Sequence, residues 1–162
     1  MIRAARQDDA AALADIYGRS VLEEASSFEL DPPSIEDMRD RFLKITAEGF
    51  PYYVAEKDGV VLGFAYASAF RPRPAYRFTV ENSVYVAPAA QGKGVAKTLM
   101  QAVILDCQKA DYRQMIAAIG SSENTASIRL HESLGFERVG VYRSVGFKFD
   151  AWHDVVLMQR AL

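Results

Sequence analysis

Residues 80–97 read VENSVYVAPAAQGKGVAK, an apolar strand with one carboxylate in it, then a turn with two glycines that opens into an amphipathic helix. Side chains alternate along a strand, so Val80 and Val84 face one side of a sheet and Glu81 and Ser83 face the other. The N–H groups of a turn at a helix N-terminus lack partners and lie at the positive end of the helix dipole. The stretch therefore predicts a site for a pyrophosphate group near Glu81.

The composition excludes several classes of protein. The chain has 162 residues, which predicts one domain, residues 1–162, because two ordinary domains need more. With 19 Lys and Arg against 21 Asp and Glu, the net charge of −2 gives no electrostatic reason to expect nucleic acid or an anionic membrane as a partner. No apolar run reaches the ~20 residues of a membrane-spanning helix, and the polar run at 6–9 interrupts any secretory signal. A small-molecule partner and a cytoplasmic location are expected.

Apolar periodicity and turn residues predict about seven strands and four helices in the order β-α-α-β-β-β-α-β-α-β-β. This is a mixed α/β layer arrangement and not the repeated βαβ series of a doubly wound nucleotide fold. Asp8 and Ser34 are expected to cap the first two helices. The expected helices are 8–24, 35–47, 95–110 and 124–133; the expected strands are 2–5, 52–56, 60–70, 78–86, 114–119, one near 139–143 and one near 155–160, the last two joined by a loop around Trp152.

The glycine turn does not match two other common phosphate motifs. A Walker loop would need Gly at Gln91 and Ala96, and a dinucleotide fingerprint would need Gly or Ala at Lys97. The run QGKGVA at 91–96, after an alternating strand, instead resembles the acyl-CoA pyrophosphate loop of the GNAT N-acyltransferases, and the LGF run at 134–136 agrees with this. The alternative is a glycine turn that caps the helix for packing alone.

The resemblance implies a single-domain GNAT fold with a mixed central sheet, acetyl-CoA as co-substrate and no metal. In that family the strand before the turn holds the acetyl and pantetheine arm, the turn holds the pyrophosphate, and the later helix contacts the pantetheine. The cofactor-binding residues implied in this way are Val84, Tyr85, Val86, Gln91, Gly92, Lys93, Gly94, Val95, Ala96, Lys97, Asn124 and Ser133.

Four parts of the chain resemble, more narrowly, the phosphinothricin and methionine sulfoximine/sulfone acetyltransferases. They are SSFE at 26–29, the run from Tyr76 to Val86, SIRLHESLGF at 127–136, and VGFK at 145–148 with Trp152-x-Asp154. The resemblance covers nearly the whole chain. It implies N-acetylation of the α-amine of a small amino acid of the phosphinothricin, methionine sulfoximine or methionine sulfone type, and a homodimer.

Glu81 is the candidate general base. N-acetylation needs the amine as a free base, so a nearby group must accept a proton from it directly or through water. A carboxylate within an apolar strand is expected to have a raised pKa, which brings it nearer to the working pH. The resemblance places the catalytic Glu of the family at this position. The alternative is a structural glutamate paired with Arg77 or another cation.

Two further parts of the chemistry have candidates. Residues 84–86 are expected to offer unpaired backbone N–H groups to the oxyanion that forms at the thioester carbonyl. His131 stands where many GNAT enzymes carry a tyrosine acid, so it is either the acid for the departing thiolate or a structural residue, in which case the thiolate leaves unprotonated. Cys107 is expected to be a buried, inert thiol, and His153 a packing or capping residue.

The α-carboxylate of an amino-acid acceptor needs a cation, and the arginines that precede the Glu81 strand suit a bidentate contact. The alternative for them is a solvated basic loop. The resemblance also implies that the two residues after Glu81 border the acceptor and that the loop between the first two helices helps to close the site. The predicted substrate-binding residues are Phe28, Glu29, Arg71, Pro72, Arg73, Asn82 and Ser83.

Two other functions stay open at this point. An acetyltransferase for protein N-termini or another amine would share the cofactor site, and its arginine cluster would be incidental. A non-catalytic acyl-CoA-binding regulatory module would need no general base, and the presence of Glu81 speaks against it.

Overall fold

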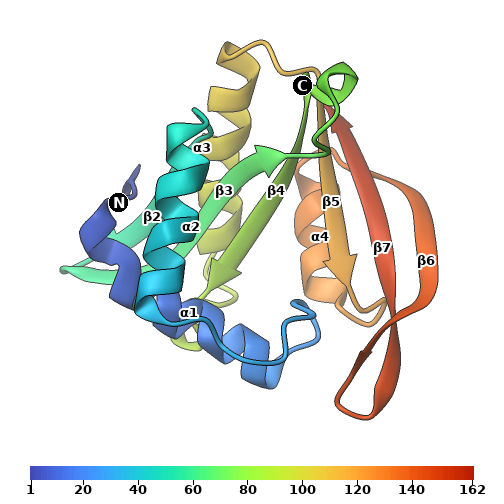
Figure 1. Cartoon of the computed structure of the whole chain (residues 1–162), viewed down its shortest axis with the longest axis horizontal. Coiled ribbons are helices and arrows are strands. Elements are labelled where there is room, and N and C mark those ends of the chain that lie inside the picture. Colours follow the sequence, from blue (N-terminus) through green and yellow to red (C-terminus); the bar gives the residue numbers. More distant parts are fainter.

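A mixed sheet of seven strands forms the centre of the computed structural model, which describes all residues 1–162 (Figure 1). The predicted element order and α/β class are confirmed. In chain order the elements are β1 (Ile2–Ala4), α1 (Ala10–Glu23), α2 (Ile35–Ala47), β2 (Tyr52–Lys57), β3 (Val60–Ala69), β4 (Thr79–Val86), α3 (Val95–Lys109), β5 (Gln114–Gly120), α4 (Thr125–Ser133), β6 (Glu137–Lys148) and β7 (Ala151–Ala161). Across the sheet the order is β1-β2-β3-β4-β5-β7-β6, and only β4 and β5 pair in parallel.

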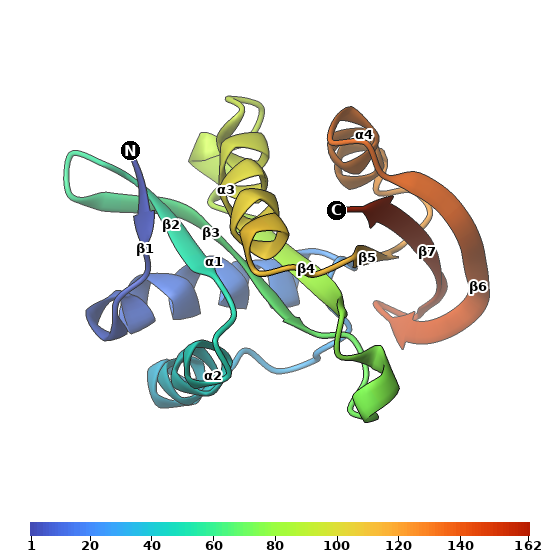
Figure 2. The same cartoon turned by 90° about the horizontal axis from the view of Figure 1, so that it is seen from above.

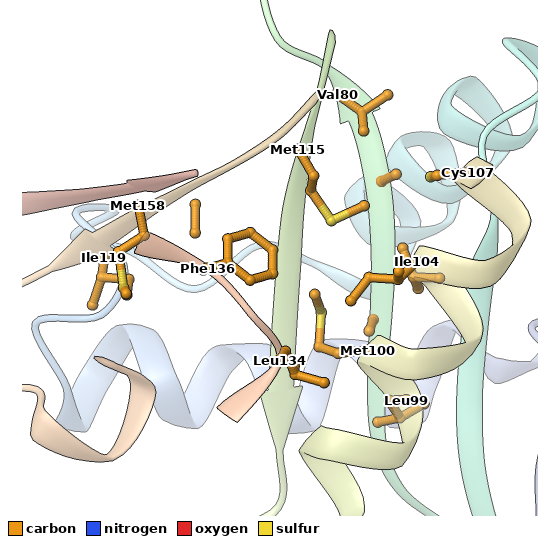
Figure 3. Packing of buried hydrophobic residues seen from close by; sticks show 14 of the residues in the cluster. Val80, Leu99, Met100, Ile104, Cys107, Met115, Ile119, Leu134, Phe136 and Met158 are labelled. Carbon is orange, nitrogen blue, oxygen red and sulfur yellow. The ribbon is translucent and has the colours of Figure 1, made fainter. Parts of the chain in front are cut away.

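Two helices cover each face of the sheet, with a hydrophobic core on each side (Figure 2). Under α1 and α2 lies a cluster of nine buried residues with many aromatic rings, among them Tyr52 and Phe64. Under α3 and α4 lies a cluster of 17, in which Met100 and Ile104 of α3 point toward the strand that carries Met115 (Figure 3). Burial of this apolar surface from both sides holds the central strands in place. None of the four helices has the length and apolar character needed to cross a membrane.

β4 and β5 separate after three residue pairs, and this opens the sheet. The last of these pairs joins Glu81 to Ile116. Beyond it, β4 stays paired with β3 as far as Val86, and β5 stays paired with β7 as far as Gly120. β4 therefore follows β3, β5 follows β7, and the two strands β4 and β5 diverge (Figure 1). The backbone N–H and C=O groups on their facing edges are left without a strand partner.

The loop between α1 and α2 is anchored across the open end of this gap. Lys148 of β6 is buried, and its Nζ donates to the carbonyl oxygens of Glu24 at 2.9 Å and Ser27 at 2.7 Å. Gly120, at the end of β5, lies against the carbonyl oxygen of Ala25, and a Cβ at Gly120 would collide with that oxygen. Contacts far apart in the sequence therefore set the position of this loop.

One of the two predicted helix caps is correct. Ser34 caps α2: its side chain accepts from Asp37 N at 3.0 Å, and Asp37 accepts from Ser34 N at 2.9 Å. The prediction for Asp8 is wrong, because the carboxylate of Asp9 accepts the N–H of Arg6 at 2.7 Å instead. A short 3₁₀ turn, Gln7–Asp9, precedes α1, and the N-cap of α1 itself makes no side-chain cap hydrogen bond.

The end of the chain differs from the prediction. β6 and β7 form one long hairpin whose tight turn lies at Phe149 and Asp150, with φ of 56° and 54°. Trp152 therefore lies in β7 and pairs with Phe147, where the sequence predicts a loop. The prediction for Cys107 is confirmed: the thiol is fully buried, and burial raises its pKa to about 12.

Candidate active site

The turn before α3 carries a run of free amides. Gly92 and Gly94 have φ of 72° and 79°, left-handed values that glycine adopts without strain, and Gly94 is the N-cap of α3. None of the amides of residues 92–97 donates to a protein acceptor, and the first that does is Thr98 N, to Gly94 O at 3.1 Å. Six consecutive N–H donors are therefore unpaired at the positive end of a helix, an arrangement that suits the oxygens of a diphosphate.

A cavity of about 620 Å³ extends from this turn between α1, β4 and α4. Its walls combine backbone amides, apolar side chains and a few polar groups, which fits a long ligand with a charged diphosphate and a less polar arm. Ten of the twelve predicted cofactor-binding residues line it: Val84, Tyr85, Val86, Gln91, Gly92, Gly94, Val95, Ala96, Lys97 and Asn124.

The other two predicted cofactor residues, Lys93 and Ser133, do not line this cavity. The Nζ of Lys93 donates to the carbonyl oxygen of Ala89 at 2.7 Å, and the Oγ of Ser133 donates to that of Leu130 at 2.8 Å. Both side chains are exposed and satisfied by the backbone nearby. Their binding roles stay predictions that their positions do not support.

A smaller cavity of about 160 Å³ lies in the gap between β4 and β5. It shares Val84, Tyr85, Gly120 and Asn124 with the larger cavity, so the two adjoin. Because the gap passes through the sheet, the small cavity is lined by consecutive residues of β4 that point to opposite faces. A group that enters from the large cavity can therefore meet a group that enters from the other face.

Glu81 lines the small cavity at the point where β4 and β5 part. No hydrogen bond or ion pair involves its carboxylate, and burial raises its pKa above the usual value for glutamate. The alternative partner, Arg77, is engaged elsewhere: its Nη1 donates to Pro74 O at 3.2 Å and its guanidinium lies over the Phe78 ring. The arrangement provides a partly buried, unpaired carboxylate in a cavity, which suits a proton acceptor.

His131 of α4 is buried and hydrogen-bonded on both sides. Its Nδ1 lies 2.7 Å from Ser127 O, and its Nε2 lies 3.0 Å from Asn82 Nδ2. The ring also packs edge-on against Phe136. Burial lowers the pKa of His131 below the usual value for histidine. Both Asn82 and His131 line the small cavity, on the face of the sheet that α3 and α4 cover.

Of the predicted acceptor residues, Asn82 and Ser83 line the small cavity and the other five line neither cavity. Phe28 packs on Gly146, and Glu29 is held by the guanidinium of Arg41 at 2.6 Å. These two residues fix the α1–α2 loop from outside. Their contact with an acceptor stays a prediction.

The arginine segment also lies outside the two cavities. Arg71 rests over the rings of Phe70 and Tyr76, and Arg71, Pro72 and Arg73 are exposed. The segment connects the end of β3 to the start of β4, so it lies at the opposite end of β4 from the glycine turn (Figure 1). Arg71 and Arg73 line neither cavity, so their contact with the acceptor stays a prediction.

One wall of the large cavity is absent from the sequence-based prediction. It comes from the last turns of α1 and the residues that follow, which carry the polar side chains Arg19, Ser20, Glu23, Glu24 and Ser26. Helix periodicity marks the apolar face of α1 but says nothing about what its polar face meets. The small residues at 25–27 are the one available signal, since they allow the loop to approach Gly120.

No group of three or more His, Cys, Asp or Glu side chains is arranged to hold a metal ion. The free amides and the cavity that extends from them fit an acyl-CoA thioester. Such a ligand would place its diphosphate at residues 92–97 and its acyl group in the gap beside Glu81.

Comparisons with known proteins agree with this geometry. The sequence profile of the acetyltransferase (GNAT) domain matches residues 2–157. A phosphinothricin N-acetyltransferase of Alcaligenes faecalis is 51% identical over 161 residues, which are 99% of this chain and 82% of the relative. An L-methionine sulfoximine/L-methionine sulfone acetyltransferase of Salmonella typhimurium is 38% identical over 161 residues, which are 99% of this chain and 94% of the relative.

A solved structure is similar over the whole chain. It is the crystal structure of a GNAT superfamily phosphinothricin acetyltransferase from Sinorhizobium meliloti in complex with acetyl-CoA, with a TM-score of 0.97 and 45% identity, covering 100% of this chain and 88% of that one. The split mixed sheet and the free-amide turn, together with these matches, identify the class as an acyl-CoA-dependent transferase. The chain belongs to the GNAT acetyltransferase family, and it is an acetyl-CoA-dependent N-acetyltransferase.

The free-amide turn can be tested with Gly94→Ala. A Cβ at a left-handed backbone position is disfavoured, so the turn should relax and re-aim its amides, and coenzyme A should bind about tenfold more weakly. Calorimetric titration of coenzyme A measures this. Gly49→Ala is the matched control, because Gly49 follows α2, lines neither cavity, has a φ of 86° and, like Gly94, has open space where a Cβ would lie. Equal affinities for both variants and the wild type would contradict the assignment.

Proposed function

We propose that this enzyme transfers an acetyl group to the α-amine of a small amino acid of the phosphinothricin, methionine sulfoximine or methionine sulfone type, with residues 1–162 acting as a single domain. The observation that carries the proposal is the unpaired, partly buried carboxylate of Glu81 in the cavity that adjoins the free-amide turn. The 51% identity to a phosphinothricin N-acetyltransferase over 99% of the chain supports the acceptor class.

The proposed chemistry is a direct transfer within the gap between β4 and β5. Bound acetyl-CoA supplies the acetyl group as a thioester. Glu81 takes the proton that the attacking amine loses, while a new N–C bond forms and the C–S bond breaks with its electron pair left on sulfur. Backbone N–H groups on the gap edge of residues 84–86 stabilise the negative charge that develops on the carbonyl oxygen. The α1–α2 loop, held by Lys148, covers the open end of the gap and limits access of water.

The base role of Glu81 predicts opposite effects of Glu81→Gln on turnover and on stability. Release of coenzyme A thiol should fall by about 100-fold or more, because amide cannot accept the proton. Burial raises the pKa of Glu81 in the folded state, so the ionised carboxylate destabilises the fold above that pKa. The Tm of the variant should therefore exceed that of the wild type at neutral pH, and this gain should fade below about pH 4.3, where the unfolded carboxyl is also protonated.

Glu137→Gln is the control for this experiment, because Glu137 is exposed and lines neither cavity. It should leave both turnover and Tm close to wild type. If Glu81→Gln released coenzyme A thiol at the wild-type rate, the proposal that Glu81 is the general base would be refuted.

We also propose that Arg71 and Arg73 bind the α-carboxylate of the acceptor. Both side chains are exposed and free of ion pairs, and a guanidinium suits bidentate contact with a carboxylate. Arg71 and Arg73 do not line either cavity of their own chain. The proposal therefore requires that the bound acceptor extends from the small cavity to these arginines, or that the segment that carries them moves toward the cavity. The double variant Arg71→Ala/Arg73→Ala should raise the KM for methionine sulfone about tenfold and leave coenzyme A affinity unchanged.

A screen of amines with purified enzyme and acetyl-CoA separates the functions. Turnover of methionine sulfone well above that of a peptide N-terminus supports the proposal. Unchanged turnover of methionine sulfone in Arg71→Ala/Arg73→Ala would refute the proposal that these arginines bind the α-carboxylate. A clear preference for the peptide would indicate an acetyltransferase for protein N-termini. Absence of thiol release with every amine would indicate a non-catalytic acyl-CoA-binding module.

A homodimer in the cytoplasm is proposed on separate grounds. The edge hairpin β6–β7 exposes large apolar side chains, and Val145, Phe147, Phe149 and Trp152 are each between 55% and 66% exposed. Several exposed large apolar side chains on an edge of a sheet indicate a protein interface. The lone thiol of Cys107 is compatible with a reducing compartment.

Analytical ultracentrifugation tests the homodimer. The wild type should sediment at twice the mass of the chain, and Phe147→Ser/Trp152→Ser should shift it toward the monomer because both side chains lie on the exposed hairpin. The exposed Leu22→Ser on α1 is the control and should not change the mass. A monomeric wild type would refute the homodimer.

A further inference from the structure

The hydrogen bonds of His131 determine where its proton lies. A carbonyl oxygen can only accept, so the 2.7 Å contact between His131 Nδ1 and Ser127 O requires a proton on Nδ1. Burial lowers the pKa of His131, which favours the neutral ring. In the neutral ring with Nδ1 protonated, Nε2 carries a lone pair and no proton. Asn82 Nδ2, at 3.0 Å, donates to this lone pair.

The same bond fixes the orientation of the Asn82 carboxamide. If the amide were rotated by half a turn, Asn82 Oδ1 would face the lone pair on Nε2, and the two acceptors would repel each other. Oδ1 must therefore point away from His131. There it is buried and has no hydrogen-bond partner within the protein. Asn82 as a whole is only 8% exposed, and it lines the small cavity together with Glu81.

A buried acceptor without a partner destabilises the folded protein, so its presence in a cavity indicates a ligand that donates to it. The reactants of an N-acetyltransferase offer N–H donors of two kinds. One is the acceptor amine, which has a second N–H besides the one whose proton goes to Glu81. The other is the amide of the cofactor arm nearest to the thioester. Either would supply the missing donor.

We propose that Asn82 Oδ1 accepts a hydrogen bond from an N–H group of the bound reactants, and that His131 is a positioning residue that holds the carboxamide in the orientation this requires. The inference rests on the proposed N-acetyltransferase function. It replaces the role of His131 as the acid for the departing thiolate, since Nε2 holds no proton to give. It also gives the bound reactants a second polar contact in the gap besides Glu81, namely Asn82 Oδ1 on the opposite face of the sheet.

Asn82→Leu removes the acceptor at nearly constant volume. The kcat/KM for methionine sulfone should fall about tenfold or more. Calorimetry with acetyl-CoA distinguishes the donors: weaker acetyl-CoA binding points to the cofactor amide, and unchanged binding with a lower kcat/KM points to the amine. Gln159→Leu is the matched control, because it removes a carboxamide that is paired with Gln114 at 2.9 Å and lines neither cavity. Wild-type kinetics and wild-type acetyl-CoA affinity in Asn82→Leu would overturn the proposal.

The positioning role of His131 has its own readouts. The ¹⁵N NMR spectrum of the wild type should show a neutral ring protonated at Nδ1. His131→Phe should lower kcat/KM by a similar factor, and Asn82→Leu/His131→Phe should be little worse than either single variant, because all three lose the same oriented oxygen. The double variant removes both polar partners together, so it keeps the test usable if one single variant does not fold.

A ring protonated at Nε2, or additive effects of the two substitutions, would overturn the positioning role. Failure of the underlying function is separate from either result. It would appear as a wild-type enzyme that releases no coenzyme A thiol with any amine.

Discussion

The loss of pairing between β4 and β5 after Glu81 and Ile116 is the constraint on which the rest of the site depends. Strands in a sheet normally satisfy their backbone groups with each other, and here the two central strands do so for only three residue pairs. Beyond these pairs, β4 stays paired with β3 and β5 stays paired with β7, and the hydrophobic cores on the two faces of the sheet hold the strands in place. The gap leaves backbone donors free, is lined by side chains from both faces of the sheet, and has a carboxylate at its narrow end.

Features that depend on nearby residues could be predicted from the sequence. The free amides of residues 92–97 follow from two glycines at the start of a helix, and the alternation of β4 follows from the pleat of a strand. The cap at Ser34 is local in the same way. The prediction for Asp8 is wrong because a short 3₁₀ turn precedes α1, and the periodicity of the following helix does not determine such a turn. Trp152 failed because its aromatic and glycine-containing surroundings are also compatible with a loop.

Features that depend on tertiary contacts could not be predicted. The α1 wall of the large cavity exists because Lys148, more than a hundred residues away, holds the carbonyl oxygens of Glu24 and Ser27. The alternation of β4 places Asn82 on the face opposite Glu81, but only the packing of α4 brings His131 to it. The arginine segment has suitable chemistry for a carboxylate, yet its place in the chain sets it at the far end of β4 from the glycine turn. The type of each residue therefore indicated the chemistry that its side chain can perform, and the topology of the fold determined which of these side chains lie close together.

The centre of the gap concentrates groups that are unfavourable for folding. Burial raises the pKa of Glu81 because its charged form has lost water without gaining a partner, and the oxygen of Asn82 is buried without a donor. Two buried polar groups far from the gap are satisfied: Lys148 has two carbonyl partners, and Asp9 is held by Arg3 and the Arg6 amide. Two unpaired polar groups that line one small cavity make the fold less stable at that place, and a bound ligand can relieve this instability. Binding of reactants that donate to both groups would then recover energy that the empty fold lacks, and the same contacts would orient the amine and the thioester for reaction.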